Sequence, residues 1–281
     1  MYCYRHPDRE TGVSCSECGR GICPDCMVFA PVGIRCPDHA GRAARPTARM
    51  TSGVRRAAYD GTGALVTKAL IAANVLVFLI NLAQGSSLTQ VQGSLFEKGA
   101  LYGPAVAQGD WYRLITATFL HAGLIHLGLN MLVLWIVGAP VEQAIGRGRF
   151  LALYLVSGLA GSAGALIFSP NAVTVGASGA IFGVLGAALV LEAQRTYVLG
   201  GQAFGLIAIN LIITFALPNT ISVGGHLGGL AGGILSMLAL SRLGRTHAIY
   251  GRPGLLGVAG VVAVGVASVL VAYFRVQGLM A

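Results

Sequence analysis

Charged residues are scarce in this sequence: Asp, Glu, Lys and Arg make up only 10% of its 281 residues, whereas 55% are hydrophobic. The apolar residues occur in long runs, without the regular alternation with polar residues that helices and strands of soluble proteins show. A helix that spans a bilayer needs roughly 20 mostly apolar residues. Seven runs meet this need, near residues 65–83, 121–140, 149–169, 176–192, 200–217, 223–240 and 254–274. The lack of charge excludes a water-soluble domain of this size and predicts an all-α polytopic membrane protein.

The first 40 residues lack the apolar core of a secretory signal peptide and contain cysteines, histidines and charged residues instead. We expect this segment to remain on the side of the membrane where it is made. It forms the first of three predicted parts, which are a Cys/His-rich module (1–40), a basic flexible linker (41–63) and a membrane domain (64–281).

The net charge of +9 is distributed unevenly along the chain. Arginines gather before the first apolar run and in alternate connections after it, at positions 147 and 149, at 195, and at 242, 245 and 252. Because Lys and Arg favour the cytoplasmic side, the pattern predicts a multi-pass protein of the cell membrane with a cytoplasmic N-terminus and an external C-terminus. Contact with headgroups of the lipid bilayer then accounts for the charge, and no nucleic-acid partner is predicted.

Cysteine is absent after Cys36, and the six cysteines form a regular pattern with two histidines. The pattern has four pairs with two residues between the members of each: Cys3/His6, Cys15/Cys18, Cys23/Cys26 and Cys36/His39. This spacing lets a tight turn direct both side chains at one ion, and eight ligands complete two closed, structural Zn²⁺ sites. Three disulfides are the alternative, but they need an oxidising compartment, and the predicted topology places the module in the cytoplasm.

The four pairs resemble B-box and related cross-brace zinc fingers, over these forty residues only. The resemblance implies that the first and third pairs share one ion and that the second and fourth pairs share the other. Without such ions, a segment with so few large apolar residues could not form a sufficient core. The spacing leaves open whether the module also binds a cytoplasmic protein partner.

Three polar elements interrupt the apolar runs, and polar residues at membrane depth are candidates for function. Ser178 lies in GASGAIFG (176–183), and His226 lies in GGHLGGLAGG (224–233). A serine among small residues is usually a packing residue. However, both runs are predicted to pass from the external side to the cytoplasmic side, so Ser178 and His226 should lie at similar depth. A serine beside an imidazole can lose its proton as it attacks a carbonyl carbon, which is nucleophilic catalysis.

No carboxylate is available as a third member of such a catalytic unit. The acidic residues in or beside the last six runs are Glu142 and Glu192, both at predicted cytoplasmic ends. We therefore predict a Ser–His dyad whose imidazole is oriented by packing against Phe182, one helical turn after Ser178. In the third polar element, Trp111–Asn130, His126 and Asn130 are four residues apart. They either donate to a developing oxyanion or satisfy each other.

Five motifs between residues 65 and 241 together resemble the rhomboid family of intramembrane proteases. They are GASG at 176–179, His226 followed by Gly229, His121 with His126 and Asn130, WYR at 111–113, and Glu142 with Gly146. The resemblance implies a six-helix core with the last run as a seventh helix. It also implies a dyad of Ser178 and His226, and an oxyanion hole of the Ser178 N–H, His126 and Asn130. Gly176 belongs to the serine motif. The external loop is the predicted connection between the first two runs, residues 84–116, and would be braced by His121, Trp111 and Arg113.

By this resemblance, the protein is expected to be a serine endopeptidase that cleaves transmembrane segments of other membrane proteins near the external surface. The chain departs from the family pattern at Gly225 and Phe182, where relatives often have Ala and Tyr, and both changes conserve shape. An inactive relative that binds client transmembrane helices without cutting them is the alternative, although such relatives typically lose the serine or the histidine. A transporter is a second alternative, but transporter sites usually lie at mid-membrane on broken helices.

Overall fold

The structure is a computed structural model that describes residues 1–29, 33–39, 63–243 and 254–279. The chain divides into two compact units, Met1–Tyr59 and Asp60–Ala281. The predicted linker, residues 41–63, lies outside the described residues apart from Gly63.

The first unit contains little regular structure. It has the 3-10 helix η1 (Pro24–Cys26) and two antiparallel strands, β1 (Val28–Phe29) and β2 (Ile34–Arg35), which form a two-stranded sheet. Its buried centre consists mainly of cysteine side chains together with Ile22, which is fully buried. Sulfur atoms, rather than a conventional apolar core, therefore fill the interior of this unit.

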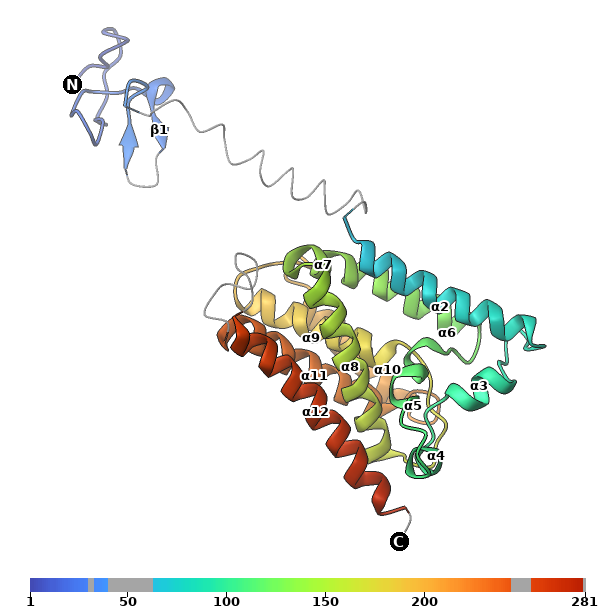
Figure 1. The fold of residues 1–281 in the computed structure, drawn as a ribbon. Coiled ribbons are helices and arrows are strands. Elements are labelled where there is room, and N and C mark those ends of the chain that lie inside the picture. The colour runs from blue at the N-terminus through green and yellow to red at the C-terminus, as the bar shows by residue number, and fades with distance from the viewer. Residues whose placement is uncertain (30–32, 40–62, 244–253, 280–281) are drawn as a thin grey trace. The chain divides into compact units, whose positions relative to one another are not determined.

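The second unit is helical (Figure 1). Its α-helices are α2 (Leu65–Ala83), α3 (Ser94–Gly99), α4 (Gly103–Ala107), α5 (Arg113–Thr116), α6 (Leu124–Val133), α7 (Ala139–Ile145), α8 (Arg147–Phe168), α9 (Ser178–Ala193), α10 (Ala203–Ala216), α11 (Val223–Leu238) and α12 (Leu255–Gln277). The 3-10 helix η2 (Ala117–Phe119) follows α5. The π-helix η3 (Leu134–Gly138) joins α6 to α7, and the π-helix η4 (Ala239–Leu243) extends α11. The short helices α3, α4 and α5 lie towards one end of the bundle, and α7 lies at the opposite end.

Within the described residues, five helical stretches are long and apolar enough to cross a bilayer, namely Leu65–Ala83, Leu124–Ile145, Arg147–Phe168, Val223–Ser241 and Leu255–Gln277. These stretches and the fold confirm an all-α polytopic membrane protein. Two of the seven predicted segments are shorter than a full span, since α9 has 16 residues and α10 has 14. Helix α9 extends only about 24 Å. It needs no full span because nearly all of it is enclosed by other helices. The irregular backbone beyond its ends is tolerated at membrane depth where protein surrounds it.

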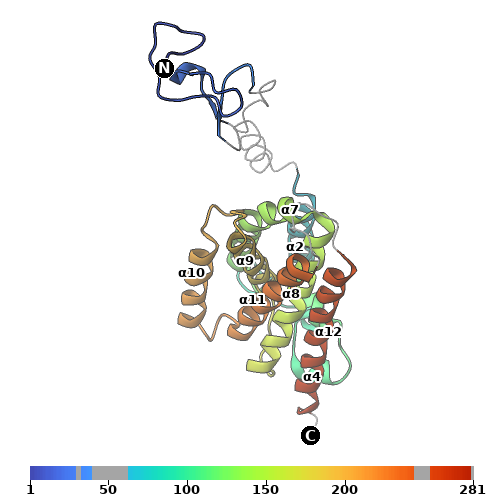
Figure 2. The ribbon, with the colours of Figure 1, turned by 90° about the vertical axis from the view of Figure 1, so that its left-hand side faces the viewer.

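Helix α8 packs against α9, α11 and α12 at the centre of the unit (Figures 1 and 2). Glycines bring the backbones of α9 and α11 into direct contact. A Cβ atom at Gly229 would lie 1.9 Å from the carbonyl oxygen of Gly179, and one at Gly233 would lie 2.0 Å from that of Gly183. We call these four residues the glycine seam. Because only small residues permit such an approach, the seam fixes the spacing of the two helices that carry Ser178 and His226.

Glu142 has a structural role in this unit. Its buried carboxylate accepts hydrogen bonds from the N–H groups of Val66 and Thr67, at 2.9 and 2.7 Å, and from the Thr67 hydroxyl at 2.8 Å. The first N–H groups of a helix have no acceptor within the helix, and a negative charge there is favourable. Glu142 thus anchors the start of α2.

Candidate active site and metal centres

The segment before Ser178 is held by backbone hydrogen bonds to the segment that contains α4 and α5. Leu101 and Thr174 form an isolated antiparallel bridge, with N–H to oxygen distances of 3.0 and 2.9 Å. The N–H of Gly176 donates to the carbonyl oxygen of Ala117 at 2.9 Å. These bonds satisfy an irregular backbone at membrane depth and fix the point at which α9 begins.

Ser178 is the first residue of α9 and is half-buried. Within the part of the chain that the structure describes, no protein group accepts a hydrogen bond from its backbone N–H. Free N–H groups and the positive end of the helix dipole both favour negative charge at a helix N-terminus. The position therefore combines a potential nucleophile with a donor suited to an oxyanion.

His226 lies on α11 beside the first turn of α9. Its imidazole stacks on the ring of Phe182, with the ring centroids 4.0 Å apart and an angle of 21° between the planes. Because Phe182 follows Ser178 by one helical turn, the stack places the imidazole against the first turns of α9. Among the described residues, no hydrogen bond joins the Ser178 hydroxyl to His226 or to another protein group. Catalytic hydrogen bonds are often long in enzymes without substrate and shorten when substrate binds.

His126 and Asn130 lie on α6, and His126 faces the segment before Ser178. A Cβ atom at Gly176, whose φ is +129°, would lie 2.8 Å from the His126 ring and 3.7 Å from the Ser178 hydroxyl. Only glycine suits both that conformation and that space. The side-chain amide of Asn130 donates to the carbonyl oxygen of His126 at 2.8 Å and keeps a second N–H. The His126 ring, Gly176 and Ser178 are thus brought together.

Two other residues of the third polar element, Arg113 and Trp111, lie in the segment around α5. Arg113 is buried and donates to the carbonyl oxygens of Glu97 and Ala100, at 2.6 and 2.8 Å, and its ion pair with Asp110 measures 2.9 Å. It therefore fastens the segment between α3 and α4. Trp111 stacks on Tyr273 of α12, with centroids 6.0 Å apart, so the seventh helix holds the same region.

His121 lies beside His126, and among the described residues no hydrogen bond or ring stack joins it to Arg113 or Trp111. It is almost fully buried, and its ring meets that of His126 edge to face, with the centroids 5.0 Å apart. Neither of its ring nitrogens has a protein partner among the described residues. A buried imidazole without a hydrogen-bond partner is unusual, which sets His121 apart from the apolar residues buried around it.

Thr214 on α10 is a residue of this site that sequence reasoning did not find. Its hydroxyl lies 2.7 Å from Nδ1 of His226 and is fully buried. The expectation that packing alone orients the imidazole is therefore incomplete. A threonine within an apolar run carries no motif, and its only signal is a second polar residue, Asn210, four positions earlier.

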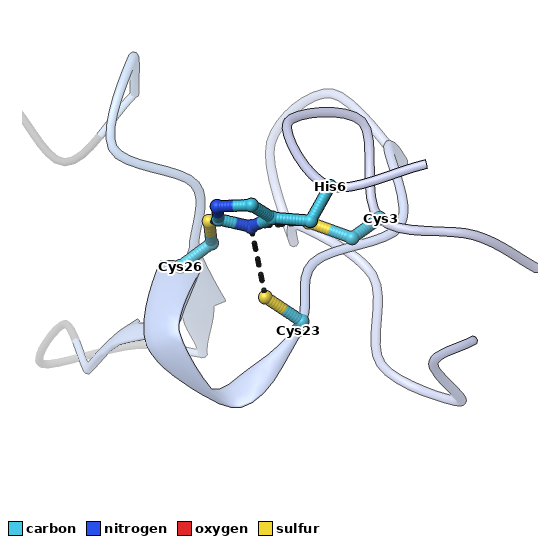
Figure 3. Close-up of side chains that lie close together, drawn as sticks. All are labelled: Cys3, His6, Cys23 and Cys26. Atoms are coloured by element: carbon cyan, nitrogen blue, oxygen red, sulfur yellow. Dashed lines mark hydrogen bonds between the residues drawn. The ribbon is translucent and has the colours of Figure 1, made fainter. Parts of the chain in front are cut away.

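In the first unit, the eight predicted metal ligands form two clusters. The first contains Cys3, His6, Cys23 and Cys26, and Figure 3 shows these side chains directed at one another. The second contains Cys15, Cys18, Cys36 and His39. This is the pairing of first with third and second with fourth that the cross-brace resemblance implies. Within each cluster, the ligand atoms all lie within 4.8 Å of one another.

The distances inside the clusters fit a tetrahedral ion with thiolate and imidazole ligands. A metal–sulfur bond of about 2.3 Å places two sulfur ligands about 3.8 Å apart and a sulfur and a nitrogen ligand about 3.5 Å apart. The Sγ atoms of Cys18 and Cys36 are 3.8 Å apart, and Nδ1 of His6 lies 3.3 and 3.4 Å from the Sγ atoms of Cys23 and Cys26. Both clusters could hold a metal ion without rearrangement.

Turns and charges in the first unit support the same arrangement. A backbone N–H three residues on donates to the carbonyl oxygen of Cys3, Cys23 and Cys36, which forms the tight turn between paired ligands. Burial and the neighbouring thiols of Cys23 and Cys3 raise the pKa of Cys26 to about 11. Thiolates crowded in this way repel one another, and a central cation would remove the repulsion.

These features define a helical, multi-pass membrane protein with a serine and a histidine on adjoining central helices. Residues 108–243 match the Rhomboid domain. The chain is 42% identical over 179 residues to "Rhomboid protease GluP" of Bacillus subtilis, covering 62% of this chain and 34% of that relative. It is 37% identical over 152 residues to "Putative rhomboid protease YdcA" of the same organism, covering 52% of this chain and 76% of that relative. The chain therefore belongs to the rhomboid family.

Coverage of other relatives is partial. The match to "RHOMBOID-like protein 7" of Arabidopsis thaliana is 38% identical over 147 residues, which is 50% of this chain and 47% of that protein. The chain thus spans about a third of GluP and about half of this plant relative. The names of these three relatives mention no metal and no substrate.

Proposed function

We propose that the protein is an intramembrane serine endopeptidase that cleaves transmembrane segments of other membrane proteins. The observation that supports this proposal best is the stack of His226 on Phe182, one helical turn after Ser178, at the N-terminus of a buried helix. The similarity to "Rhomboid protease GluP" and "Putative rhomboid protease YdcA" also supports it.

In the proposed mechanism, Ser178 is the nucleophile and His226 is the general base. As the Ser178 hydroxyl attacks the carbonyl carbon of the scissile bond, His226 accepts its proton and later gives it to the leaving amine. The carbonyl oxygen becomes an oxyanion, to which the Ser178 N–H, His126 and Asn130 donate. Water then attacks the acyl carbon and gives its proton to His226, which passes a proton to the Ser178 oxygen as the bond between that oxygen and the acyl group breaks.

The catalytic unit is proposed to be a dyad, because the two carboxylates in or beside the last six apolar runs, Glu142 and Glu192, are engaged elsewhere. Glu142 anchors the start of α2. Glu192 accepts hydrogen bonds from the N–H groups of Leu199, Gly201 and Ala203, at 3.0, 3.0 and 3.1 Å, and so fixes the turn before α10. Both carboxylates therefore support helices, and among the described residues no hydrogen bond or ion pair joins His226 to a carboxylate.

The fluorophosphonate reaction tests this function directly. Purified protein in detergent should be labelled at Ser178, because these reagents modify a serine that a neighbouring base activates. Ser178→Ala and His226→Ala should both abolish labelling, whereas Ser169→Ala, which alters an exposed serine at the end of α8, should not. A well-folded protein that binds transmembrane peptides but is never labelled would favour the alternative, an inactive relative that holds client helices.

We also propose that the N-terminus is cytoplasmic and that the active site opens to the external side of the cell membrane. The distribution of arginines supports this orientation. A cysteine probe at Gln92 should react with an impermeant reagent added from outside, whereas a probe at Arg147 should not. The reverse pattern would contradict the orientation and the external cleavage site with it.

We propose that each cluster in the first unit holds one structural Zn²⁺. The set of six cysteines and two histidines is typical of zinc, and closed four-ligand sites leave no position for a reacting water. Metal analysis of the intact protein should find two Zn²⁺ per chain, reduced to one in Cys15→Ser/Cys18→Ser. Deletion of residues 1–63 should remove both ions and leave fluorophosphonate labelling of Ser178 intact. Protein without zinc, or a folded deletion variant without labelling, would contradict this proposal.

A further inference from the structure

Thr214 makes two short contacts from one hydroxyl group. Its oxygen lies 2.7 Å from the carbonyl oxygen of Asn210, one turn earlier on α10, and 2.7 Å from Nδ1 of His226 on α11. The buried residues of α10 are Ala203, Ile207 and Thr214, while much of the rest of the helix is exposed at the edge of the unit (Figure 2). Thr214 is therefore the polar group that α10 directs towards the histidine.

The positions of the protons follow from what each atom can donate. A carbonyl oxygen only accepts, so a hydrogen bond to Asn210 must use the single hydroxyl proton of Thr214. Threonine hydroxyls in helices commonly bond the carbonyl four residues earlier in this way. The hydroxyl oxygen then has only lone pairs to offer His226, and the 2.7 Å contact is a hydrogen bond only if Nδ1 carries the imidazole proton. With the proton on Nε2 instead, Nδ1 would also be an acceptor. The single Thr214 proton could then serve only one of its two neighbours, and the other 2.7 Å contact would bring two lone pairs together.

We propose that Thr214 is a positioning residue that holds His226 in the tautomer with hydrogen on Nδ1. This proposal rests on the proposed function, in which His226 is the general base. In this tautomer Nε2 carries the free lone pair, and Nε2 makes no hydrogen bond with a protein group among the described residues. Phe182 restrains the plane of the ring and Thr214 restrains its rotation, so that Nε2 remains available to the Ser178 proton. A neutral hydroxyl thus takes the orienting role that an aspartate has in a catalytic triad.

The tautomer can be observed without any assay of activity. In protein labelled with ¹⁵N-histidine, the two ring nitrogens of a neutral imidazole have well-separated NMR shifts. The His226 signals are identified by their loss in His226→Ala. We expect a protonated Nδ1 and an unprotonated Nε2 in the wild type. A protonated Nε2 would overturn the proposal, whether or not the protein proves to be a protease.

Substitutions separate positioning from packing. Thr214→Val keeps the shape but leaves the Nδ1–H of His226 buried without an acceptor, and kcat should fall about ten- to a hundredfold with KM little changed. Thr214→Ser restores the hydroxyl and should regain most of the turnover. As a matched control, Ser268→Ala removes a hydroxyl that bonds the carbonyl four residues earlier on α12 and makes no hydrogen bond to a histidine among the described residues, and kcat should not change.

The outcomes also distinguish the two proposals. Full turnover in Thr214→Val, or a loss that Thr214→Ser does not recover, would overturn the positioning role and leave the proposed protease function standing. A wild type that cleaves nothing would refute the proposed function, and the NMR measurement would then decide the tautomer alone.

Discussion

Replacing Ser178 with alanine is expected to reduce cleavage of a transmembrane reporter substrate by roughly 10⁴-fold or more. A nucleophile and its base act as one unit, so His226→Ala should cause a loss of similar size, and the double variant should be little worse than either single variant. The measurement is kcat for the purified variants, with circular dichroism to show that the helices remain. Wild-type turnover in Ser178→Ala would refute the assignment of the active site.

The oxyanion donors should contribute less than the dyad. Removal of one such donor typically reduces kcat roughly 10²- to 10³-fold, and this range is expected for His126→Ala and for Asn130→Ala. Ser169→Ala is the matched control for the serine substitution and should retain full turnover. Equal, complete loss in all four active-site variants would indicate a folding defect rather than this division of roles.

Replacing Gly233 with alanine is expected to be strongly destabilising. The new methyl group would lie 2.0 Å from the carbonyl oxygen and 2.3 Å from the Cα atom of Gly183. Extra methyl groups in packed interiors typically cost about 1–3 kcal/mol. The upper part of that range is expected, because the obstacle is backbone, which cannot rotate away as a side chain would. The expected result is a markedly lower unfolding temperature in detergent.

The control for this substitution is Gly205→Ala on α10. A Cβ atom there meets nothing within 4 Å, and the helical propensity of alanine is higher than that of glycine. Gly205→Ala should therefore leave the unfolding temperature unchanged or slightly raised. If both variants unfolded at the same temperature, the close contact at the glycine seam would not be a determinant of stability.

The helical segments could be predicted from the sequence because their signal is strong and local. Long apolar runs need no knowledge of partners, and seven were found at the right places. The lengths of α9 and α10 were less accessible, because the length of a helix in a membrane depends on whether lipid or protein surrounds it. Gly176 stands inside the predicted run 176–192, yet in the structure it precedes α9 and its N–H donates to the carbonyl oxygen of Ala117.

The candidate site was predictable as far as its residues belong to motifs. Ser178, His226, His126 and Gly176 stand in glycine-rich or histidine-rich patterns. The structure places His126 and Ser178 beside Gly176, and it places His226 against Phe182. Thr214 and the position of His121 could not be found in this way. The contact of Thr214 with His226 depends on the rotation of α10 against α11. The position of His121 depends on the packing of its ring against His126. Neither leaves a pattern in the sequence.

The enclosure of α9 has a consequence for how the chain enters the membrane. Contact with lipid contributes little to the insertion of this helix. Only one of its 16 residues, Ala193, is exposed in the folded protein. During synthesis, α8 and α9 emerge before α11, so Gly179 and Gly183 must face lipid or translocation machinery until their partners arrive. In a nascent chain that ends after α10, α9 should therefore be inserted only weakly in the membrane. The insertion of α11 should then fix the depth of Ser178 in the membrane.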